Sequence, residues 1–113
     1  MGMAAHSSRK LGLLGEDLAV GFLLRRGISI VGRNVFVDRD EIDIIYRGEN
    51  GLVAVEVKTV RKGADPFEAL TVDKMRRIRR AAAHHPRPIA AIDAIGVALS
   101  DVGVEVRWLR RIR

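Results

Sequence analysis

The first pattern along the chain is a helical spacing of apolar residues. Ser7 or Ser8 is suited to the N-cap of a helix, and Gly27 lies where a helix commonly ends in a left-handed residue. We therefore expect a helix over residues 7–26. The apolar residues that carry this spacing, at intervals of three and four, are Leu11, Leu14, Leu18 and Phe22.

Stretches rich in β-branched residues predict strands elsewhere in the chain. Glycines at positions 48 and 51 predict a hairpin turn between the second and third stretches. We expect the third stretch to be central because of its β-branched character, and the first to be interrupted near Gly32. The predicted strands cover residues 28–37, 42–46, 52–60, 89–99 and 104–109.

A second helix is predicted between the third and fourth strands. Asp65-Pro66 and Thr71 both offer a start for it, and the pair His84-His85, followed by prolines, ends it. The helical spacing gives it one apolar face and one arginine face. The apolar face carries Met75, Ile78 and Ala82, and the arginine face carries Arg76, Arg77 and Arg80.

The order of these elements predicts an α/β fold with a mixed central sheet flanked by helices. A length of 113 residues suits a single domain over residues 1–113. The chain has no cysteine, which excludes disulfides, thiolate zinc sites and a cysteine nucleophile. It also has no apolar run long enough for a membrane span and no signal-peptide pattern, so we expect a cytoplasmic protein without a membrane partner.

Charge is unevenly distributed. The chain carries 20 Lys+Arg against 14 Asp+Glu, and residues 71–87 hold six basic residues against Asp73 alone. Acidic residues predominate between positions 40 and 58. Because carboxylates repel phosphates unless a cation lies between them, acids among basic flanks indicate a metal-dependent enzyme acting on a polyanion. A solvated basic face is the alternative interpretation.

Three ionisable residues lie within strands that should be buried. Alternation places Glu56 and Lys58 on one face of the third strand, and the predicted hairpin brings Asp43 beside them. Carboxylate oxygens are the ligands that Mg²⁺ prefers, and Lys58 is suited to orient a water or to stabilise developing negative charge. A buried ion pair without catalysis is the alternative interpretation.

The first helix raises further candidates. Glu16 points either to a site or to solvent, since the adjacent Asp17 carries the same charge. The glycines at positions 12, 15 and 21 weaken a helix and indicate close packing against the sheet. His6 and the two histidines at the end of the second helix lack the spacing of metal ligands.

An ordered series of motifs resembles the YraN-like family of small bacterial proteins. That family is similar to archaeal Holliday-junction resolvases and belongs with the PD-(D/E)XK nuclease superfamily. The resemblance covers residues 10–99. The matching elements are Gly15-Glu16, Gly27, Ile30, Asn34, Glu41-Ile42-Asp43-Ile44-Ile45 and Val55-Glu56-Val57-Lys58-Thr59.

The resemblance implies a restriction-endonuclease-like fold, a homodimer, and specific roles for individual residues. Asp43 and Glu56 would bind Mg²⁺ or Mn²⁺, Lys58 would be the catalytic lysine, and Glu16 an additional catalytic acid. The chain departs from the family pattern at three positions. Asp40 replaces a glycine before the Glu-Ile-Asp element, Val60 replaces an arginine after the lysine, and Ala91 replaces an arginine two residues before Asp93.

These observations predict a metal-dependent endonuclease that hydrolyses phosphodiester bonds in DNA, including branched, Holliday-junction-like DNA. Basic residues of the second helix are expected to contact the DNA backbone, with the C-terminal arginines extending the basic surface. The first alternative is a non-catalytic nucleic-acid-binding module that retains the nuclease fold. The second is a scaffold that binds other proteins. The expected DNA contacts are Lys74, Arg76, Arg77 and Arg80, and Asp93 is expected to be a structural residue at a strand end.

Overall fold

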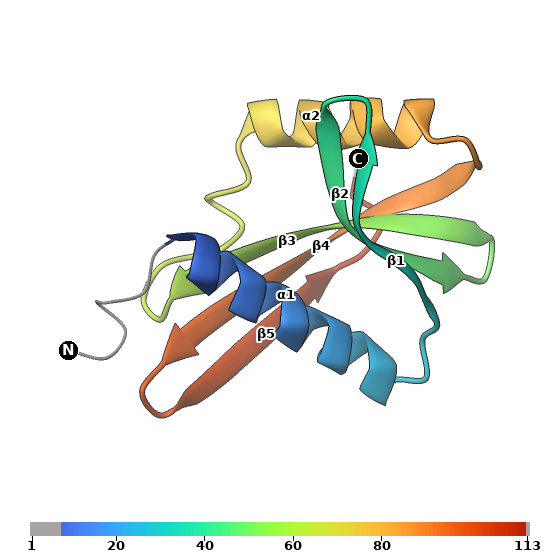
Figure 1. Cartoon of the computed structure of the whole chain (residues 1–113). Helices are drawn as coiled ribbons and strands as arrows, with labels where there is room; N and C mark the ends of the chain where they lie inside the picture. Colours follow the sequence, from blue (N-terminus) through green and yellow to red (C-terminus); the bar gives the residue numbers. More distant parts are fainter. Residues whose placement is uncertain (1–7, 113) are drawn as a thin grey trace.

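The computed structural model describes residues 8–112 and contains two helices and five strands (Figure 1). The elements follow one another in the predicted order, and Ser7 and His6 lie outside the described residues. The irregularity expected near Gly32 is present as a register shift between Ile30 and Gly32. The elements are α1 (Ser8–Arg25), β1 (Ile30–Val37), β2 (Asp40–Gly48), β3 (Gly51–Arg61), α2 (Val72–His84), β4 (Ile89–Ser100) and β5 (Gly103–Leu109).

The five strands form one mixed sheet in the order β1-β2-β3-β4-β5. Three neighbouring pairs are antiparallel, and β3 and β4 are parallel because α2 carries the chain back between them. β3 is therefore central, as the sequence predicted. The arrangement is an α/β fold and is consistent with a restriction-endonuclease-like fold.

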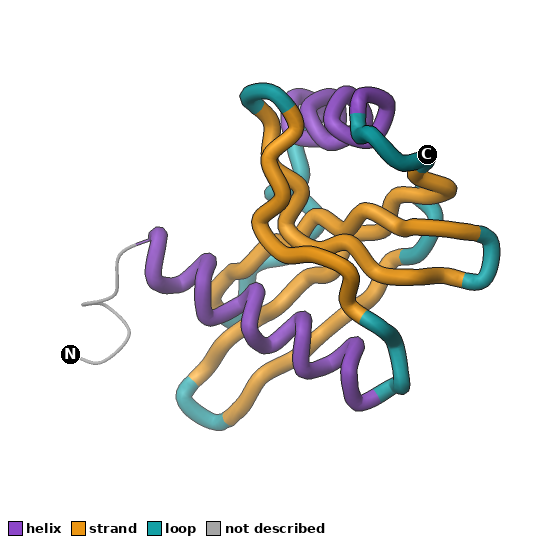
Figure 2. The backbone as a smooth tube through the Cα atoms, turned by 45° about the vertical axis from the view of Figure 1, so that its right-hand side comes forward, coloured by secondary structure: helices purple, strands orange, loops and turns teal. Residues whose placement is uncertain are grey.

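The two helices bury different faces of the sheet. Alternation along β3 directs Val53, Val55 and Val57 into the cluster that contains α1 residues Ala19 and Leu23. Leu52 and Ala54 face the other way, into the cluster that contains α2 residues Ile78 and Ala81. In Figure 2, α1 runs across the sheet, while α2 lies beside the tip of the β1–β2 hairpin.

Gly15 sets how α1 packs on the sheet. A Cβ atom at Gly15 would overlap the side chain of Thr59 on β3, so only glycine permits this approach. The close packing expected of the glycines is thus confirmed here, whereas a Cβ at Gly12 would meet nothing. The buried line runs through Gly15, Ala19 and Leu23. Inclusion of Leu14 in the buried stripe was wrong: it is 45% exposed, because the glycine line faces the sheet.

Each helix has a recognisable cap at one of its ends: α1 at its C-terminus and α2 at its N-terminus. Gly27 has a φ of 76°, and the N–H groups of Gly27 and Ile28 donate to the carbonyls of Leu24 and Leu23, which is the Schellman arrangement. Thr71, rather than Asp65-Pro66, is the N-cap of α2, and its hydroxyl accepts a hydrogen bond from the Lys74 N–H.

The second helix does not present all its arginines on one outer face. Arg80 turns toward the β1–β2 hairpin, where its Nε and Nη2 donate to the two oxygens of Asp40 at 2.7 and 2.8 Å. The predicted orientation of Arg80 was wrong because the spacing could not reveal that the hairpin tip reaches this helix (Figure 1). Among residues 8–112, no helix is long and apolar enough to cross a membrane.

Candidate functional site

The candidate site lies where β2 separates from β3. Backbone pairing between the two strands ends at Ile44 and Val55, and the next position on β2 is Asp43. An Asp43 side-chain oxygen accepts a hydrogen bond of 2.8 Å from the Val57 N–H, which would otherwise lack a partner from β2. The buried Asp43 side chain therefore replaces a backbone hydrogen-bond partner for β3 where β2 separates from it. This point lies beside Glu56.

Two cavities open at this division, of about 280 and 260 Å³, and they share Asp43, Glu56 and Lys74. The structure therefore brings together the two acids that the sequence singled out. The first cavity adds residues of the hairpin and of α2: Phe36, Arg39, Asp40, Glu41, Arg77 and Ile78. The second adds residues of α1 and β3: Leu11, Gly12, Glu16, Val57, Lys58 and Thr59.

The pKa values of the two carboxyl groups are both raised. Burial raises the pKa of Asp43 well above its usual range, and the Glu56 charge raises it further, against the effect of the Val57 N–H. Burial likewise raises the pKa of Glu56, against the charges of Lys74 and Lys58. Two buried, neighbouring carboxylates need either protons or cations to offset their repulsion and desolvation.

Two lysines from different elements bring their amines together at the site. Lys58 comes from β3 and lines the cavity with Glu16, whereas Lys74 comes from the first turn of α2. The interaction with the Lys74 amine, followed by burial, lowers the pKa of Lys58, while the charges of Glu56 and Asp43 raise it. Lys74, predicted only as a DNA contact, is therefore also part of the acidic site.

Glu16 reaches the site because α1 packs so closely on β3. It follows Gly15 directly and lines the same cavity as Asp43 and Glu56. Asn34 Nδ2 donates a hydrogen bond of 2.8 Å to Glu16 Oε1, and Asn34 adopts a left-handed φ of 49°. The solvated-face interpretation of Glu16 is thus replaced by a side chain held at the cavity.

The acids suit a hard divalent cation with few protein ligands. Within the described part of the chain, no group of three His, Cys, Asp or Glu side chains is arranged to enclose an ion. Mg²⁺ commonly binds proteins through only one or two carboxylates and keeps waters in its other positions. Asp43 and Glu56 provide that number of oxygen donors, with Glu16 and Glu41 nearby.

The basic residues of α2 differ in how far they are already engaged. Arg76 and Arg77 pair with Asp73 at 3.4 and 2.7 Å, and both arginines are more than half exposed. Arg80 is bound through two hydrogen bonds to Asp40, whose pKa that contact lowers. Asp40 therefore links the β1–β2 hairpin to α2 through a salt bridge.

Comparisons with known proteins identify the family of the chain. The family described as "Uncharacterised protein family UPF0102" matches residues 15–97. The chain belongs to this family. A UPF0102 protein of Dictyoglomus turgidum is 34% identical over 111 residues, covering 90% of this chain and 93% of that protein. A UPF0102 protein of Syntrophotalea carbinolica is 45% identical over 75 residues, covering 64% of this chain and 60% of that protein.

Membership of the UPF0102 family confirms the YraN-like resemblance. The matched segment contains every acid of the site and both of its lysines. A UPF0102 protein of Pseudarthrobacter chlorophenolicus is 42% identical over 96 residues, covering 77% of this chain and 72% of that protein. The names of these relatives state no activity, so the chemistry of UPF0102 must be argued from the site itself.

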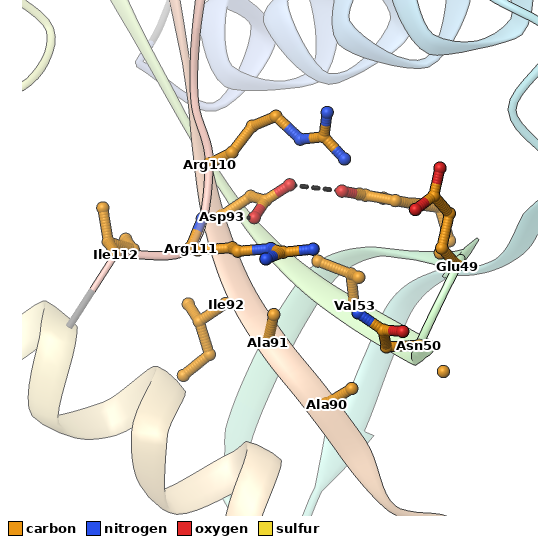
Figure 3. Close-up of a pocket in the computed structure, with 13 residues that line it drawn as sticks. Glu49, Asn50, Val53, Ala90, Ala91, Ile92, Asp93, Arg110, Arg111 and Ile112 are labelled. Carbon is orange, nitrogen blue, oxygen red and sulfur yellow. Dashed lines mark hydrogen bonds between the residues drawn. The ribbon is translucent and has the colours of Figure 1, made fainter.

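A second buried carboxylate lies outside the candidate site. Asp93 accepts hydrogen bonds from Tyr46 Oη, from Trp108 Nε1 at 2.9 Å and from the Arg111 N–H at 2.8 Å. Figure 3 shows Asp93 beside Arg110 and Arg111, with the first of these bonds dashed. It is 1% exposed and lies within β4, so its expected place at a strand end was wrong. The three donors give it the structural role that was predicted.

The C-terminal arginines surround this second region. Arg110 lies over the Trp108 ring. Arg110 and Arg111 also line a cavity of about 300 Å³ with Asp93 (Figure 3). That cavity shares no lining residue with the two cavities at Asp43. Arg110 and Arg111 therefore form a separate surface rather than an extension of α2.

Some site residues carried only a weak sequence signal. Glu41 lies in the Glu-Ile-Asp element, in which only the aspartate was a predicted site residue, and Asn34 had no predicted role. Phe36 gave no signal, because an aromatic residue in a β-rich stretch usually indicates a core position. Their contribution depends on the bend of the hairpin, which pattern alone does not specify.

Proposed function

We propose that this protein is a metal-dependent nuclease that hydrolyses phosphodiester bonds in DNA, including branched DNA. The observation that carries the proposal is the meeting of Asp43 and Glu56 in cavities that two lysines also line. Acids crowded in this way are typical of sites that use a cation to approach a phosphate. When bound, Mg²⁺ or Mn²⁺ would neutralise charge on the scissile phosphate and acidify a water.

The acids have distinct tasks under this proposal. Asp43, fixed by the Val57 N–H, and Glu56 would hold the cation through their carboxylate oxygens. Glu16, fixed by Asn34, accepts hydrogen bonds from water at the edge of the same cavity. These supporting hydrogen bonds keep the donors oriented, as ligand sites require.

The lysines act on the substrate side. Lys58 lies in the same cavity as Glu16 and donates hydrogen bonds toward the oxygen that gains negative charge during hydrolysis. Lys74 faces both cavities and draws the phosphate toward the acids. Arg76 and Arg77 contact flanking phosphates, since their exposed guanidiniums exchange Asp73 for DNA more readily than Arg80 exchanges Asp40.

The proposal extends to assembly and location. A symmetric homodimer would present two such sites to a two-fold substrate such as a four-way junction. A DNA-processing enzyme of this kind acts in the bacterial cytoplasm. Gel filtration alone and with junction DNA tests the first of these statements.

Cleavage of labelled DNA tests the activity. Wild type and Glu56→Gln are incubated with four-way-junction, flap, single-stranded and linear duplex DNA in Mg²⁺, Mn²⁺ or EDTA. We expect metal-dependent cutting by wild type and a loss of about 100-fold or more in Glu56→Gln, because the substitution removes a charged ligand of the cation. Glu105→Gln, an exposed position on β5, is the matched control and should cut like wild type.

Two outcomes would decide against the proposal. If wild type binds the DNAs but cuts none, the protein is a nucleic-acid-binding module. If it neither binds nor cuts, the acids and lysines form a structural ion-pair cluster.

A further inference from the structure

Phe36 differs from the other aromatic residues in its exposure and in its ring contacts. Phe22 and Tyr46 each contact the Trp108 ring edge-on, and Phe67 lies under the Arg107 guanidinium. Phe36 is 70% exposed and makes no comparable ring or cation contact within residues 8–112. The ring therefore has a free face.

The position of Phe36 relates that free ring to the acids. Phe36 is paired with Glu41 across the β1–β2 hairpin and lines the cavity that also contains Asp43 and Glu56. Its neighbours in sequence, Val35 and Val37, turn to the opposite side and pack against the cluster under α2. The strand thus fixes the ring on the side that faces the site.

The surroundings of Phe36 favour a charged polymer over an apolar partner. The cavity lined by Phe36 also contains three basic side chains and four carboxylates, and the flanking valines of β1 are turned inward. The basic residues are Arg39, Lys74 and Arg77, and the acids are Asp40, Glu41, Asp43 and Glu56. A single ring among charged side chains is a poor docking patch for an apolar protein surface, which needs a contiguous apolar area. It suits a nucleobase, whose flat face stacks on an aromatic ring while its phosphate meets the cations.

We propose that Phe36 stacks on an unpaired base next to the phosphate held at the acids, so that the preferred substrate is DNA with an unpaired or splayed base. The inference rests on the proposed nuclease function and specifies its substrate class. In continuous duplex, both faces of each base are already stacked, so the ring gains nothing there without extruding a base. Flaps, branch points and single strands offer a free base face.

Binding measurements on the full chain test the inference apart from cleavage. Affinities of wild type, Phe36→Ala and Phe36→Trp are measured by fluorescence anisotropy on single-stranded, flap and linear duplex DNA, both in EDTA and in Ca²⁺, a cation that offsets the charge of the acids. We expect Phe36→Ala to weaken single-strand and flap binding by about fivefold or more, and duplex binding by less than about twofold, because stacking on one base is lost. Phe36→Trp should retain or strengthen flap binding.

A position-specific signal locates the contact. The adenine analogue 2-aminopurine, placed at the unpaired position of the flap, loses fluorescence when it stacks. Wild type and Phe36→Trp should quench it, and Phe36→Ala should not. Val102→Ala, which removes a side chain that is 88% exposed in the turn between β4 and β5, is the matched control and should behave as wild type.

The outcomes separate this inference from the nuclease proposal. If wild type cuts DNA and Phe36→Ala binds every substrate equally well, or weakens them all alike, the stacking role is wrong and the nuclease stands. If Phe36→Ala instead converts a dimer to a monomer in gel filtration, the ring covers a second copy of the chain. If wild type binds none of the DNAs, both proposals fail.

Discussion

Two buried clusters in this sheet contain aspartate, and their surroundings differ. Asp93 receives three hydrogen bonds, from Tyr46, Trp108 and the Arg111 N–H. Asp43 accepts a hydrogen bond from the Val57 N–H and has Glu56 as a neighbour. A carboxylate that is fully bonded holds strands together, whereas crowded carboxylates are poised for a proton or a cation.

The largest expected effect is on stability at the bonded cluster. Asp93→Ala removes the acceptor of three donors, two of them side chains that the fold has taken from water. We expect the free energy of unfolding in urea to fall by about 3–5 kcal/mol, because buried donors are left without partners. Asp101→Ala, in the exposed turn between β4 and β5, should change it by less than about 0.5 kcal/mol. Equal effects of the two substitutions would mean that Asp93 is not a structural anchor.

A smaller effect is expected when one donor of that cluster is removed. Tyr46→Phe keeps the ring in the core but removes the hydroxyl that bonds Asp93, and it should lower the free energy of unfolding by about 1–2 kcal/mol. In an Asp93→Ala background the same substitution should have little further effect. A double-mutant cycle measures this coupling, and full additivity would show that the two residues act separately.

Much of the fold follows from the sequence because buried positions recur with the period of each element. They alternate in a strand and recur every three to four residues in a helix. The β-branched runs and the Gly48–Gly51 turn predicted strands and register, and alternation along β3 correctly grouped Glu56 with Lys58. The buried face of α1 was misjudged at Leu14 because the pattern of large residues does not register a glycine line that contacts Thr59. The spacing of large apolar residues shows which side chains avoid water. How closely a helix packs on a sheet depends also on the size and shape of the side chains between them.

The site was predictable where its residues stood out against an apolar strand, as Asp43 and Glu56 do. The site was not predictable where contacts between residues distant in the sequence determine the partner of a side chain. The Asp40–Arg80 pair joins residues 40 positions apart, and the three donors of Asp93 come from β2 and from the C-terminal end of the chain, both distant in sequence from β4. Asp93 also stands among β-branched neighbours, so its sequence signal equals that of Asp43. Only the count of donors around each carboxylate distinguishes them.

Divalent cations should distinguish the two clusters in solution. At a concentration about ten times its dissociation constant, Mg²⁺ should stabilise wild type by about 1.4 kcal/mol, because it binds only the folded state. The thermal shift should grow from pH 6 to pH 8, since the cation must displace protons from carboxyls whose pKa values are raised. Asp101→Ala should show the same shift as wild type. If the thermal shift does not change with pH, the ion binds at a site other than these two carboxyl groups.

The same raised pKa values fix the sign of the pH dependence without a cation. The folded protein binds more protons than the unfolded chain above the ordinary pKa values of 3.8 for Asp43 and 4.5 for Glu56. The contribution of these groups is therefore full below those values, and stability declines as pH rises through the raised folded pKa values. Urea unfolding across this range in EDTA measures the decline, and a rise in stability attributable to these groups would contradict it.

The smallest expected effect decides between the active site and a structural ion pair. Asp43→Asn keeps an oxygen for the Val57 N–H and removes the charge that opposes Glu56. At pH 8 in EDTA it should raise the free energy of unfolding by about 1 kcal/mol, as expected when a strained functional group is neutralised. Asp101→Asn should leave it unchanged. A loss of stability in Asp43→Asn would show that the carboxylate already serves as the partner of Lys58 and Lys74. In that case, the acids would resemble Asp93 in role, and the contrast between the two clusters would disappear.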